Sequence, residues 1–245
     1  MMSVHILLSG STGTVGRELV DCINEDDDFH LSGTASRELF FEPDIDADVI
    51  VDFSHPSLLR QVVAYASQRR LPLVIGTTGI PDDLNAEILQ ASEHIAVCQA
   101  ANFSLGLNLM IRLASEAAGT LGERFDIEIC EAHHRRKLDA PSGTALLLGE
   151  SLARARGLDA DDSAAFDRSR QRIARSADEI GYQSIRGGDG AGEHTVLFLG
   201  DGERLEITHR ATDRAIFARG ALMAAQRLID HPPGMIDFMD LVLTS

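Results

Sequence analysis

Positive charge is scarce in this sequence. Its 245 residues include 22 Lys and Arg against 38 Asp and Glu, which gives a formal net charge of −16. Nucleic acids and anionic membrane surfaces attract positively charged proteins, so this balance argues against both. We therefore expect no nucleic-acid partner and no membrane partner.

Cysteine and long apolar runs are also scarce. Cys22, Cys98 and Cys130 lie far apart and form no CxxC motif, so neither a disulfide framework nor a zinc site is indicated. No apolar stretch reaches 18 residues, and the first residues lack the basic segment of a signal peptide. The sequence predicts a cytoplasmic protein without a metal site. Its 44% apolar content suffices for one large domain or two modest ones.

The first hundred residues alternate between short apolar runs and helical patterns. Apolar runs of this kind are typical of buried parallel strands. Repeated strand–helix alternation predicts a doubly wound α/β sheet. The expected strands span residues 4–8, 30–35, 49–52, 73–75 and 95–98.

A glycine-rich loop, Gly10 to Gly16, joins the first expected strand to the first expected helix. Gly10 permits a tight turn, Gly13 lets the backbone approach a pyrophosphate, and Gly16 lets the helix pack closely on the strand. The spacing is GxxGxxG rather than GxGxxG. A plain strand–helix turn is therefore the alternative to a dinucleotide site.

The end of the second expected strand bears on cofactor choice. About twenty residues after the glycines, an acidic residue would bind the adenosine ribose of NAD. This sequence has Ser36 and Arg37 there. A hydroxyl and a guanidinium can instead accept a 2′-phosphate. Arg37 as an ordinary solvated surface residue is the alternative.

Five consecutive residues, His133 to Lys137, can all carry positive charge. They follow a strand-like alternation from Phe125 to Cys130 and precede a helix start, in which Pro141 suits the first turn and Ser142 can cap. Backbone N–H groups at residues 142–144 would face the space beside these cations, which predicts an anion site. A solvated basic loop is the plain alternative. A metal site is disfavoured, because adjacent histidines point apart in an extended segment.

Residues 131–145 resemble the signature of the dihydrodipicolinate reductase family, Glu-x-His-His-x-x-Lys-x-Asp-Ala-Pro-Ser-Gly-Thr-Ala, at every specified position. Three shorter segments also resemble that family: Gly76 to Gly79, Asn102 to Ser104 and Glu193 to Thr195. The likeness extends over both halves of the chain.

The resemblance implies a Rossmann-like doubly wound parallel sheet plus an α+β substrate and oligomerisation domain with an open mixed sheet. The expected dinucleotide-binding domain comprises residues 1–103 and 214–245, and the second domain residues 104–213. The implied activity is the reduction by NADPH or NADH of a heterocyclic dicarboxylate to tetrahydrodipicolinate, in lysine and diaminopimelate biosynthesis. The implied assembly is a homotetramer.

The resemblance also implies roles for single residues. His133 would be the general acid, and Lys137 would protonate or orient the reacting ring nitrogen. His134, Gly143 and Thr144 would bind the substrate carboxylates. The implied cofactor-binding residues are Gly10, Ser11, Thr12, Gly13, Thr14, Val15, Ser36, Arg37, Gly76, Thr77, Thr78, Ala100, Ala101, Asn102 and Phe103.

Other expectations concern the second half of the chain. Leu105, Leu109 and Leu113 follow helical spacing and predict core packing. Asp201-Gly202 predicts a two-residue hairpin, and residues 159–180 predict irregular or weakly helical structure. His194 and His209 have no partner identifiable from sequence, so we expect a core or surface position for each. The tail 235–243 should pack back on the first domain.

Two other functions are alternatives to a reductase. An aldehyde dehydrogenase would use Cys98 or Cys130 as its nucleophile, but neither lies in a recognisable nucleophile motif. A redox sensor that binds NAD(P) without turnover would not need His133 and Lys137 together beside a helix-terminal anion site. Substrate-dependent oxidation of NAD(P)H would distinguish both from a reductase.

Overall fold

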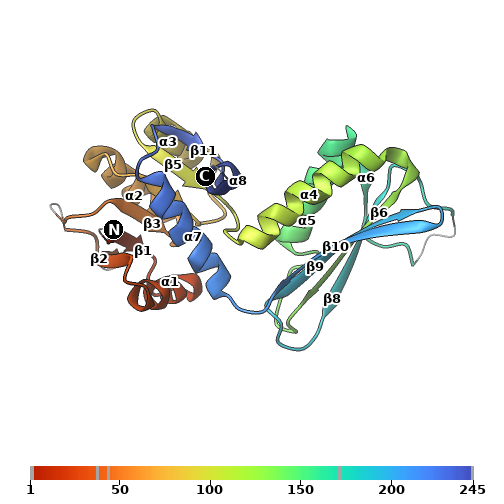
Figure 1. Cartoon of the computed structure of the whole chain (residues 1–245), viewed down its shortest axis with the longest axis horizontal. Coiled ribbons are helices and arrows are strands. Elements are labelled where there is room, and N and C mark those ends of the chain that lie inside the picture. The colour runs from red at the N-terminus through yellow and green to blue at the C-terminus, as the bar shows by residue number, and fades with distance from the viewer. Residues whose placement is uncertain (1–2, 37–38, 43–44, 170–172, 244–245) are drawn as a thin grey trace. The chain divides into compact units, whose positions relative to one another are not determined.

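The computed structural model describes residues 3–36, 39–42, 45–169 and 173–243. The chain forms two compact units (Figure 1). The first comprises Met1–Leu105 and Arg214–Ser245, and the second comprises Gly106–Asp213. None of the described helices is long and apolar enough to cross a membrane.

A six-stranded parallel sheet forms the centre of the first unit, in the order β11-β5-β4-β3-β1-β2. Its strands are β1 (Val4–Ser9), β2 (Phe29–Ala35), β3 (Val49–Asp52), β4 (Leu73–Ile75), β5 (Ala96–Gln99) and β11 (Gly234–Ile236). Its helices are α1 (Thr14–Glu25), α2 (Pro56–Arg69), α3 (Asp82–Ser92), α7 (Ala215–Leu228) and α8 (Phe238–Leu243). These bounds confirm each strand expected in the first hundred residues.

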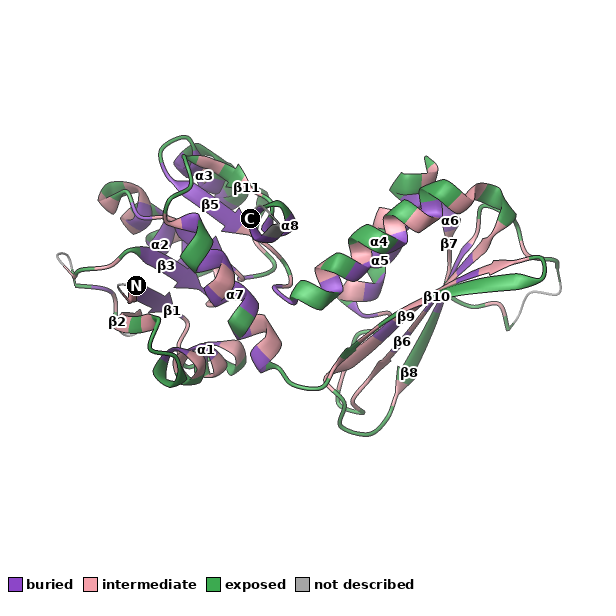
Figure 2. Cartoon of the chain, viewed as in Figure 1, coloured by how far each residue is buried: buried purple, intermediate pink, exposed green. Residues whose placement is uncertain are grey.

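Both faces of this sheet are covered. One apolar cluster joins the strands to α1, α7 and α8, and another joins them to α2 and α3. Strands β3 and β4 are buried along their whole length, and Figure 2 shows β3 in purple. A strand covered on both sides needs an uninterrupted apolar run, which Val49–Val51 and Leu73–Ile75 supply. The doubly wound fold is confirmed.

The C-terminal tail completes the first unit. Strand β11 pairs in parallel with β5. The side chains of Phe238 and Leu241 in α8 are buried in the cluster that α1 and α7 share. The prediction that this tail packs back on the first domain is confirmed.

The second unit is built on a mixed five-stranded sheet, in the order β10-β9-β6-β8-β7. Its strands are β6 (Asp126–His133), β7 (Ala164–Ala165), β8 (Ile180–Arg186), β9 (Gly192–Gly200) and β10 (Glu203–Ala211). Strands β6, β7 and β8 run parallel, whereas β9 is antiparallel to both β6 and β10. Its helical segments are α4 (Leu105–Leu121), η1 (Gly122–Arg124), α5 (Gly143–Arg156) and α6 (Ala160–Ser163).

Helices cover one face of this sheet. Buried residues of α4 and α5 pack on Ile127, Ile129, Val196 and Phe198. The strand registers put the alternate residues, such as Leu197 and Leu199, on the opposite face. The expected open mixed sheet is therefore confirmed.

Helix α4 corrects one prediction. Leu105, Leu109 and Leu113 are 40%, 41% and 46% exposed, so they are not core residues. The buried residues of this helix are Leu107, Met110, Ala114 and Ala118. Both sets repeat at helical spacing, and periodicity alone does not say which set faces the sheet.

The segment 159–180 is irregular with one short helix where it is described, which agrees with the prediction, and only its strand β7 was not expected. It contains the short helix α6 and the two-residue strand β7, which extends the sheet beyond β8. The predicted hairpin at Asp201-Gly202 is confirmed, because these residues form the turn between β9 and β10.

Candidate active site

Strand β6 delivers two ionisable side chains to the helix-covered face of its sheet. Ile127 and Ile129 are fully buried, and the same alternation continues to Glu131 and His133. Glu131 is only 1% exposed. A carboxylate buried this deeply needs compensating partners.

Arg186, the last residue of β8, supplies the main compensation. Its two terminal nitrogens lie 2.7 Å from Glu131 Oε2 and 2.6 Å from Oε1, a two-pronged ion pair. The Ser142 N–H also donates to Oε1, at 3.3 Å. Burial alone would raise the pKa of Glu131, but hydrogen bonds from Arg186, Ser184 and His133 outweigh it and hold the pKa at about 2.

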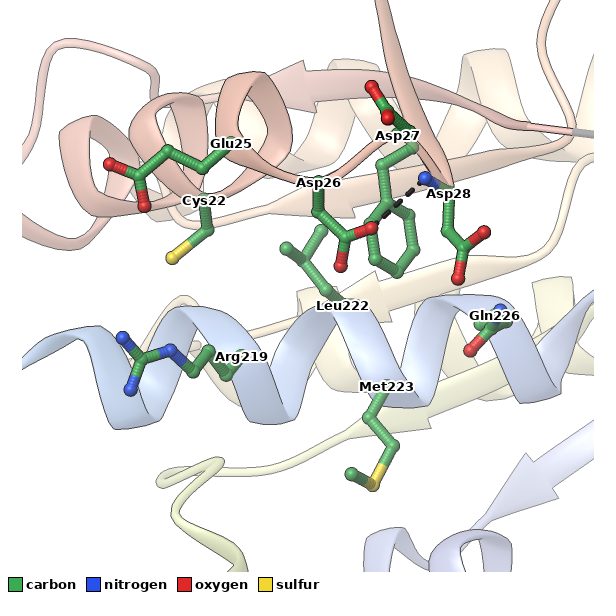
Figure 3. A pocket seen from close by; sticks show the side chains of 10 residues that line it. Cys22, Glu25, Asp26, Asp27, Asp28, Arg219, Leu222, Met223 and Gln226 are labelled. Atoms are coloured by element: carbon green, nitrogen blue, oxygen red, sulfur yellow. Dashed lines mark hydrogen bonds between the residues drawn. The ribbon is translucent and has the colours of Figure 1, made fainter.

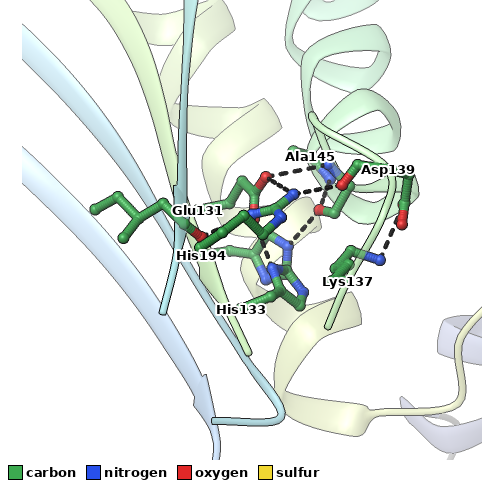
Figure 4. Close-up of polar contacts among 9 residues, drawn as sticks. Glu131, His133, Lys137, Asp139, Ala145 and His194 are labelled. Carbon is green, nitrogen blue, oxygen red and sulfur yellow. Dashed lines mark hydrogen bonds and ion pairs between the residues drawn. The ribbon is translucent and has the colours of Figure 1, made fainter. Parts of the chain in front are cut away.

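His133 is the third partner of this carboxylate (Figure 4). Its Nδ1 lies 2.5 Å from Glu131 Oε2. Burial lowers the pKa of His133, Glu131 raises it, and the positive charges of Lys137 and Arg186 lower it again, with a net decrease. The ring also packs against Gly192, where a Cβ would lie 2.8 Å from Nε2. Strand β9 therefore leaves room for this ring only because residue 192 is glycine.

His194 belongs to the same cluster. Its Nε2 lies 3.0 Å from Ser142 Oγ, and its ring meets that of His133 edge to face at 5.1 Å. Burial lowers the pKa of His194 to about 4, so it is neutral near pH 7. Of the two positions expected for His194, core or surface, the structure shows the core. Sequence reasoning missed its partners, because they lie more than 50 residues away in the chain.

The basic run separates into two groups. Arg135 and Arg136 are exposed, whereas His133, His134 and Lys137 are partly buried. His134 Nδ1 is buried and makes no hydrogen bond with the described residues, as suits a group whose partner is a ligand. Lys137, the only lysine of the chain, pairs with Asp139 at 2.9 Å.

The N-terminus of α5 adjoins this cluster. Ser142 is its N-cap and accepts a hydrogen bond from the Ala145 N–H. We expected Pro141 in the first turn of the helix, but it precedes the N-cap. The Ser142 N–H, expected to face an anion, is bonded to Glu131 instead. A Cβ at Gly143 would meet nothing within 4 Å, so packing within the protein does not require this glycine.

The glycine loop of the first unit lies at the carboxyl ends of the parallel strands, where such sheets bind ligands. Gly10 has φ 86°, and a Cβ there would lie 2.3 Å from the Phe53 carbonyl oxygen. A Cβ at Gly16 would lie 2.0 Å from the Gly10 carbonyl oxygen, so Gly16 packs against the loop itself rather than the strand. No side chain caps α1 at Gly13, which leaves its first N–H groups suited to a pyrophosphate.

A hollow of about 150 Å³ adjoins this loop. Its wall includes Ser36, at the end of β2, whereas Arg37 lies outside the described residues. The lining residues that sequence reasoning missed are Phe53, Ser54, His55 and Leu58. Their position directly after β3, at the same sheet edge, was the available signal. The backbone therefore fits a dinucleotide at this edge.

Buried Asp52, at the end of β3, connects two loops at this edge through hydrogen bonds. Its Oδ1 accepts from Ser54 Oγ at 2.6 Å, and its Oδ2 accepts from Thr77 Oγ1 at 2.5 Å. Thr77 Oγ1 also accepts from the Ser54 N–H at 2.8 Å. The hydroxyl of Thr77 is thus directed into the protein, and only its backbone is available to a cofactor.

The other predicted cofactor residues lie along the same edge. Ser11 and Thr12 belong to the glycine loop, Thr14 and Val15 begin α1, Gly76 and Thr78 follow β4, and Ala100, Ala101 and Asn102 follow β5. The ring of Phe103 is buried against those of Phe53 and Phe238, so only its backbone could contact a ligand. The structure therefore gathers the described members of this set at one sheet edge.

A second hollow of the first unit is unsuited to either expected ligand. It has a volume of about 640 Å³ and lies between α1 and α7 (Figure 3). Four consecutive acidic residues, 25–28, line it together with Arg219 and apolar side chains. Carboxylates repel phosphates and dicarboxylates, so neither is expected there.

The cysteines do not form a nucleophilic site. Burial raises the pKa of Cys98 to about 12, assisted by the charge of Asp237. Burial also raises the pKa of Cys130, with Glu131 and Glu193 adding to the effect. Both thiols are protonated at neutral pH, whereas a nucleophilic cysteine needs its thiolate. This argues against the aldehyde dehydrogenase alternative.

Comparison with known proteins covers both units. Residues 4–103 match the family model described as dihydrodipicolinate reductase, N-terminus, and residues 106–242 match that of the C-terminus. Relatives named 4-hydroxy-tetrahydrodipicolinate reductase include one from Halorhodospira halophila, 39% identical over 98% of this chain and 99% of that protein. One from Nitrosomonas europaea is 40% identical over 99% of both chains.

Solved structures share the fold. Dipicolinate-bound dihydrodipicolinate reductase from Paenisporosarcina sp. TG-14 superimposes with a TM-score of 0.81 at 24% identity, over 99% of this chain and 100% of that one. A diaminopimelate dehydrogenase from Corynebacterium glutamicum, solved with diaminopimelate, gives a TM-score of 0.55 at 14% identity, over 100% of this chain and 97% of that one. At these identities, the likeness concerns the fold alone.

Proposed function

Because the chain belongs to the dihydrodipicolinate reductase family, we propose that it is a 4-hydroxy-tetrahydrodipicolinate reductase. It reduces a heterocyclic dicarboxylate to tetrahydrodipicolinate with NADPH or NADH. The observation that carries this proposal is the buried Glu131–His133 pair, 2.5 Å apart, beside the N-terminus of α5. This arrangement supplies a proton donor and an anion-binding helix end in one place.

The second unit binds and protonates the substrate. His133 donates a proton from Nε2, because its Nδ1 is bonded to Glu131. Lys137 contributes a positive charge and orients the reacting ring nitrogen. His134, Gly143 and Thr144 bind the carboxylates, a role supported by the buried Nδ1 of His134 and the open space at Gly143.

The first unit binds the dinucleotide. When bound, NADPH or NADH supplies the hydride. The backbone of the glycine loop and the uncapped N-terminus of α1 hold the pyrophosphate, and Ser36 with Arg37 receives a 2′-phosphate. The segments after β4 and β5, 76–78 and 100–103, hold the nicotinamide portion through their backbone.

The same family membership supports a proposal for the cellular setting. The product serves lysine and diaminopimelate biosynthesis, and the protein acts in the cytoplasm, where its three unpaired cysteines would be stable. We further propose a homotetramer. Support comes from the face of the mixed sheet opposite α4 and α5, where Ile185 is 55% exposed.

Loss of NADPH absorbance on addition of the heterocyclic substrate tests the proposal. A reductase oxidises NADPH only when the substrate is present. Binding of NADPH without substrate-dependent oxidation would instead identify a redox sensor.

A further inference from the structure

We propose that Glu131, clamped by Arg186, is a positioning residue that fixes the orientation and the proton-donating nitrogen of His133. The inference rests on the proposed role of His133 as the proton donor. The carboxylate lies beneath the imidazole and is buried, so its part is to hold the donor rather than to contact the substrate.

The hydrogen-bond donors around Glu131 determine the tautomer of His133. Arg186 donates to both oxygens of Glu131, and a guanidinium has no acceptor. The carboxylate is ionised and can only accept, so the proton between it and His133 belongs to Nδ1. The neutral ring is thus the Nδ1–H tautomer, and the transferable proton is the one on Nε2.

Contacts on several sides prevent the side chains of Glu131 and His133 from rotating. Arg186 also donates to two backbone carbonyl oxygens, that of Asp139 at 2.6 Å and that of the preceding residue, Ile185, at 2.8 Å. The guanidinium therefore fixes the carboxylate on one side, while Ser142 N–H holds Oε1 on the other. At the opposite edge of the imidazole, space beside Nε2 exists only because Gly192 has no Cβ. Neither His133 nor Glu131 can turn without breaking several of these contacts.

The charged groups around His133 determine how readily its ring is protonated. The groups that face His133 are Glu131 on β6, Lys137 in the signature loop, Arg186 on β8 and His194 on β9. Burial and the two cations disfavour the imidazolium, and Glu131 is the carboxylate that favours it. Without Glu131, His133 would lose its proton at a lower pH and would be a poor donor near neutrality.

The proton balance is simple. The proton leaves His133 Nε2 for the substrate nitrogen and would balance the charge of the hydride that a bound cofactor supplies. The hydroxyl group of a 4-hydroxy substrate would in addition leave as water. The imidazole then becomes neutral, retains Nδ1–H towards Glu131, and regains a proton at Nε2 from water. Glu131 remains ionised throughout, as does the carboxylate of a serine-protease triad.

The experiment is the pH dependence of kcat/KM for Glu131→Gln. Removing the negative charge lowers the pKa of His133, so the loss of activity with rising pH should begin at a lower pH, displaced by about one unit. At pH 8, which lies above both pKa values, a displacement of one unit lowers the protonated fraction of His133 and therefore the activity about tenfold. The activity should recover in part at pH 6. A uniform loss with an unmoved profile would overturn the proposal.

Two further variants separate charge from folding. Glu131→Asp keeps the charge and should keep the wild-type position of the profile, even if turnover falls. Glu128→Gln is the matched control: it lies three residues earlier on β6, pairs with Arg175 on the opposite face, and should leave the profile unchanged. A shift of equal size in Glu128→Gln would also overturn the proposal.

A measurement without turnover makes the two proposals separately testable. Nitrogen-15 NMR of the full-length protein, with the His133 signal assigned by His133→Gln, reports the tautomer of the neutral ring. We expect Nδ1–H in the wild type and its loss in Glu131→Gln. An Nε2–H wild-type ring would refute the positioning role. Inactivity of the wild type, with Nδ1–H observed, would refute only the proposed function.

Discussion

Single residues decide the chemistry of the second unit, and His133 is the most constrained of them. Its ring is bonded to Glu131, stacked edge-on by His194 and limited by Gly192. We predict that His133→Gln binds NADPH normally but loses about 10²- to 10⁴-fold in kcat, the usual contribution of a positioned acid. Steady-state kinetics with a cofactor titration checks this. Turnover near wild type would remove His133 from the acid role.

Lys137 offers a selective test, because it is the only lysine of the chain. Lys137→Ala should lose turnover and substrate affinity while NADPH affinity stays near wild type. Arg136→Ala is the matched control, since it removes an exposed positive charge from the adjacent position and should change little. An amine-reactive acetylating reagent, read by mass spectrometry, should modify Lys137 more slowly when dipicolinate is present. Protection by NADPH alone would mean that the loop binds the cofactor phosphates.

Ser36 governs a third prediction, on cofactor choice. It lines the hollow beside the glycine loop, where an acidic residue would repel a 2′-phosphate. Wild type should use NADPH at least as well as NADH, and Ser36→Glu should shift the preference towards NADH. The measurement is the ratio of kcat/KM for the two cofactors, which does not depend on the active fraction of the preparation. A wild-type preference for NADH of about tenfold, or 1.4 kcal/mol, would contradict the reading of Arg37 as a phosphate ligand.

At the residue scale, the sequence predicted the cationic residues of the site but not the buried side chains that contact them. The alternation Ile127, Ile129, Glu131 placed the carboxylate on the buried face, so its burial could have been predicted. Arg186 and His194 could not be assigned to it, because β8 and β9 are brought to β6 only by sheet pairing. Local sequence carries no signal for such long-range partners.

At the scale of elements, the carboxyl ends of β3 and β4 are linked through Asp52. Its carboxylate accepts hydrogen bonds from Ser54, which follows β3 beside the glycine loop, and from Thr77, which follows β4. Asp52→Ala leaves the buried hydroxyl of Thr77 without its acceptor, a cost of about 1–3 kcal/mol. We expect NADPH to bind about tenfold more weakly.

Fluorescence titration of NADPH measures this effect. Asp48→Ala is the control, because Asp48 bonds the His5 N–H at the opposite edge of the same sheet. It should leave NADPH affinity unchanged. Equal weakening in both variants would mean that general loosening of the sheet, not the Asp52 linkage, is responsible.

Element positions were largely predictable because parallel strands buried on both faces have unmistakable apolar runs. The face of α4 was not predictable, because Leu105, Leu109 and Leu113 repeat at helical spacing, as does the buried set beginning at Leu107. Which set is buried depends on how the helix lies on its sheet. That information is in the tertiary structure.

At the scale of the whole molecule, the open face of the mixed sheet bears on assembly. Ile185 lies on that face, opposite Ala132 in the sheet register. We predict that Ile185→Glu dissociates the proposed tetramer, since a buried unpaired charge is costly at an interface. Light scattering coupled to size-exclusion chromatography measures the mass.

Leu89→Glu is the matched control for assembly. Leu89 is a 62% exposed apolar residue of α3 in the first unit. It should keep four times the chain mass, as should the wild type. A monomeric wild type, or dissociation by Leu89→Glu alone, would contradict the assignment of the interface to the mixed sheet.

Transfer of a hydride to a heterocyclic dicarboxylate is the proposed reaction of this chain. The most direct measurement uses NADPH deuterated at C4 of the nicotinamide and mass spectrometry of the product. We predict tetrahydrodipicolinate that carries one deuterium from the cofactor, formed by wild type and about 10²- to 10⁴-fold more slowly by His133→Gln. Unlabelled product, or bound NADPH with no product at all, would contradict the account.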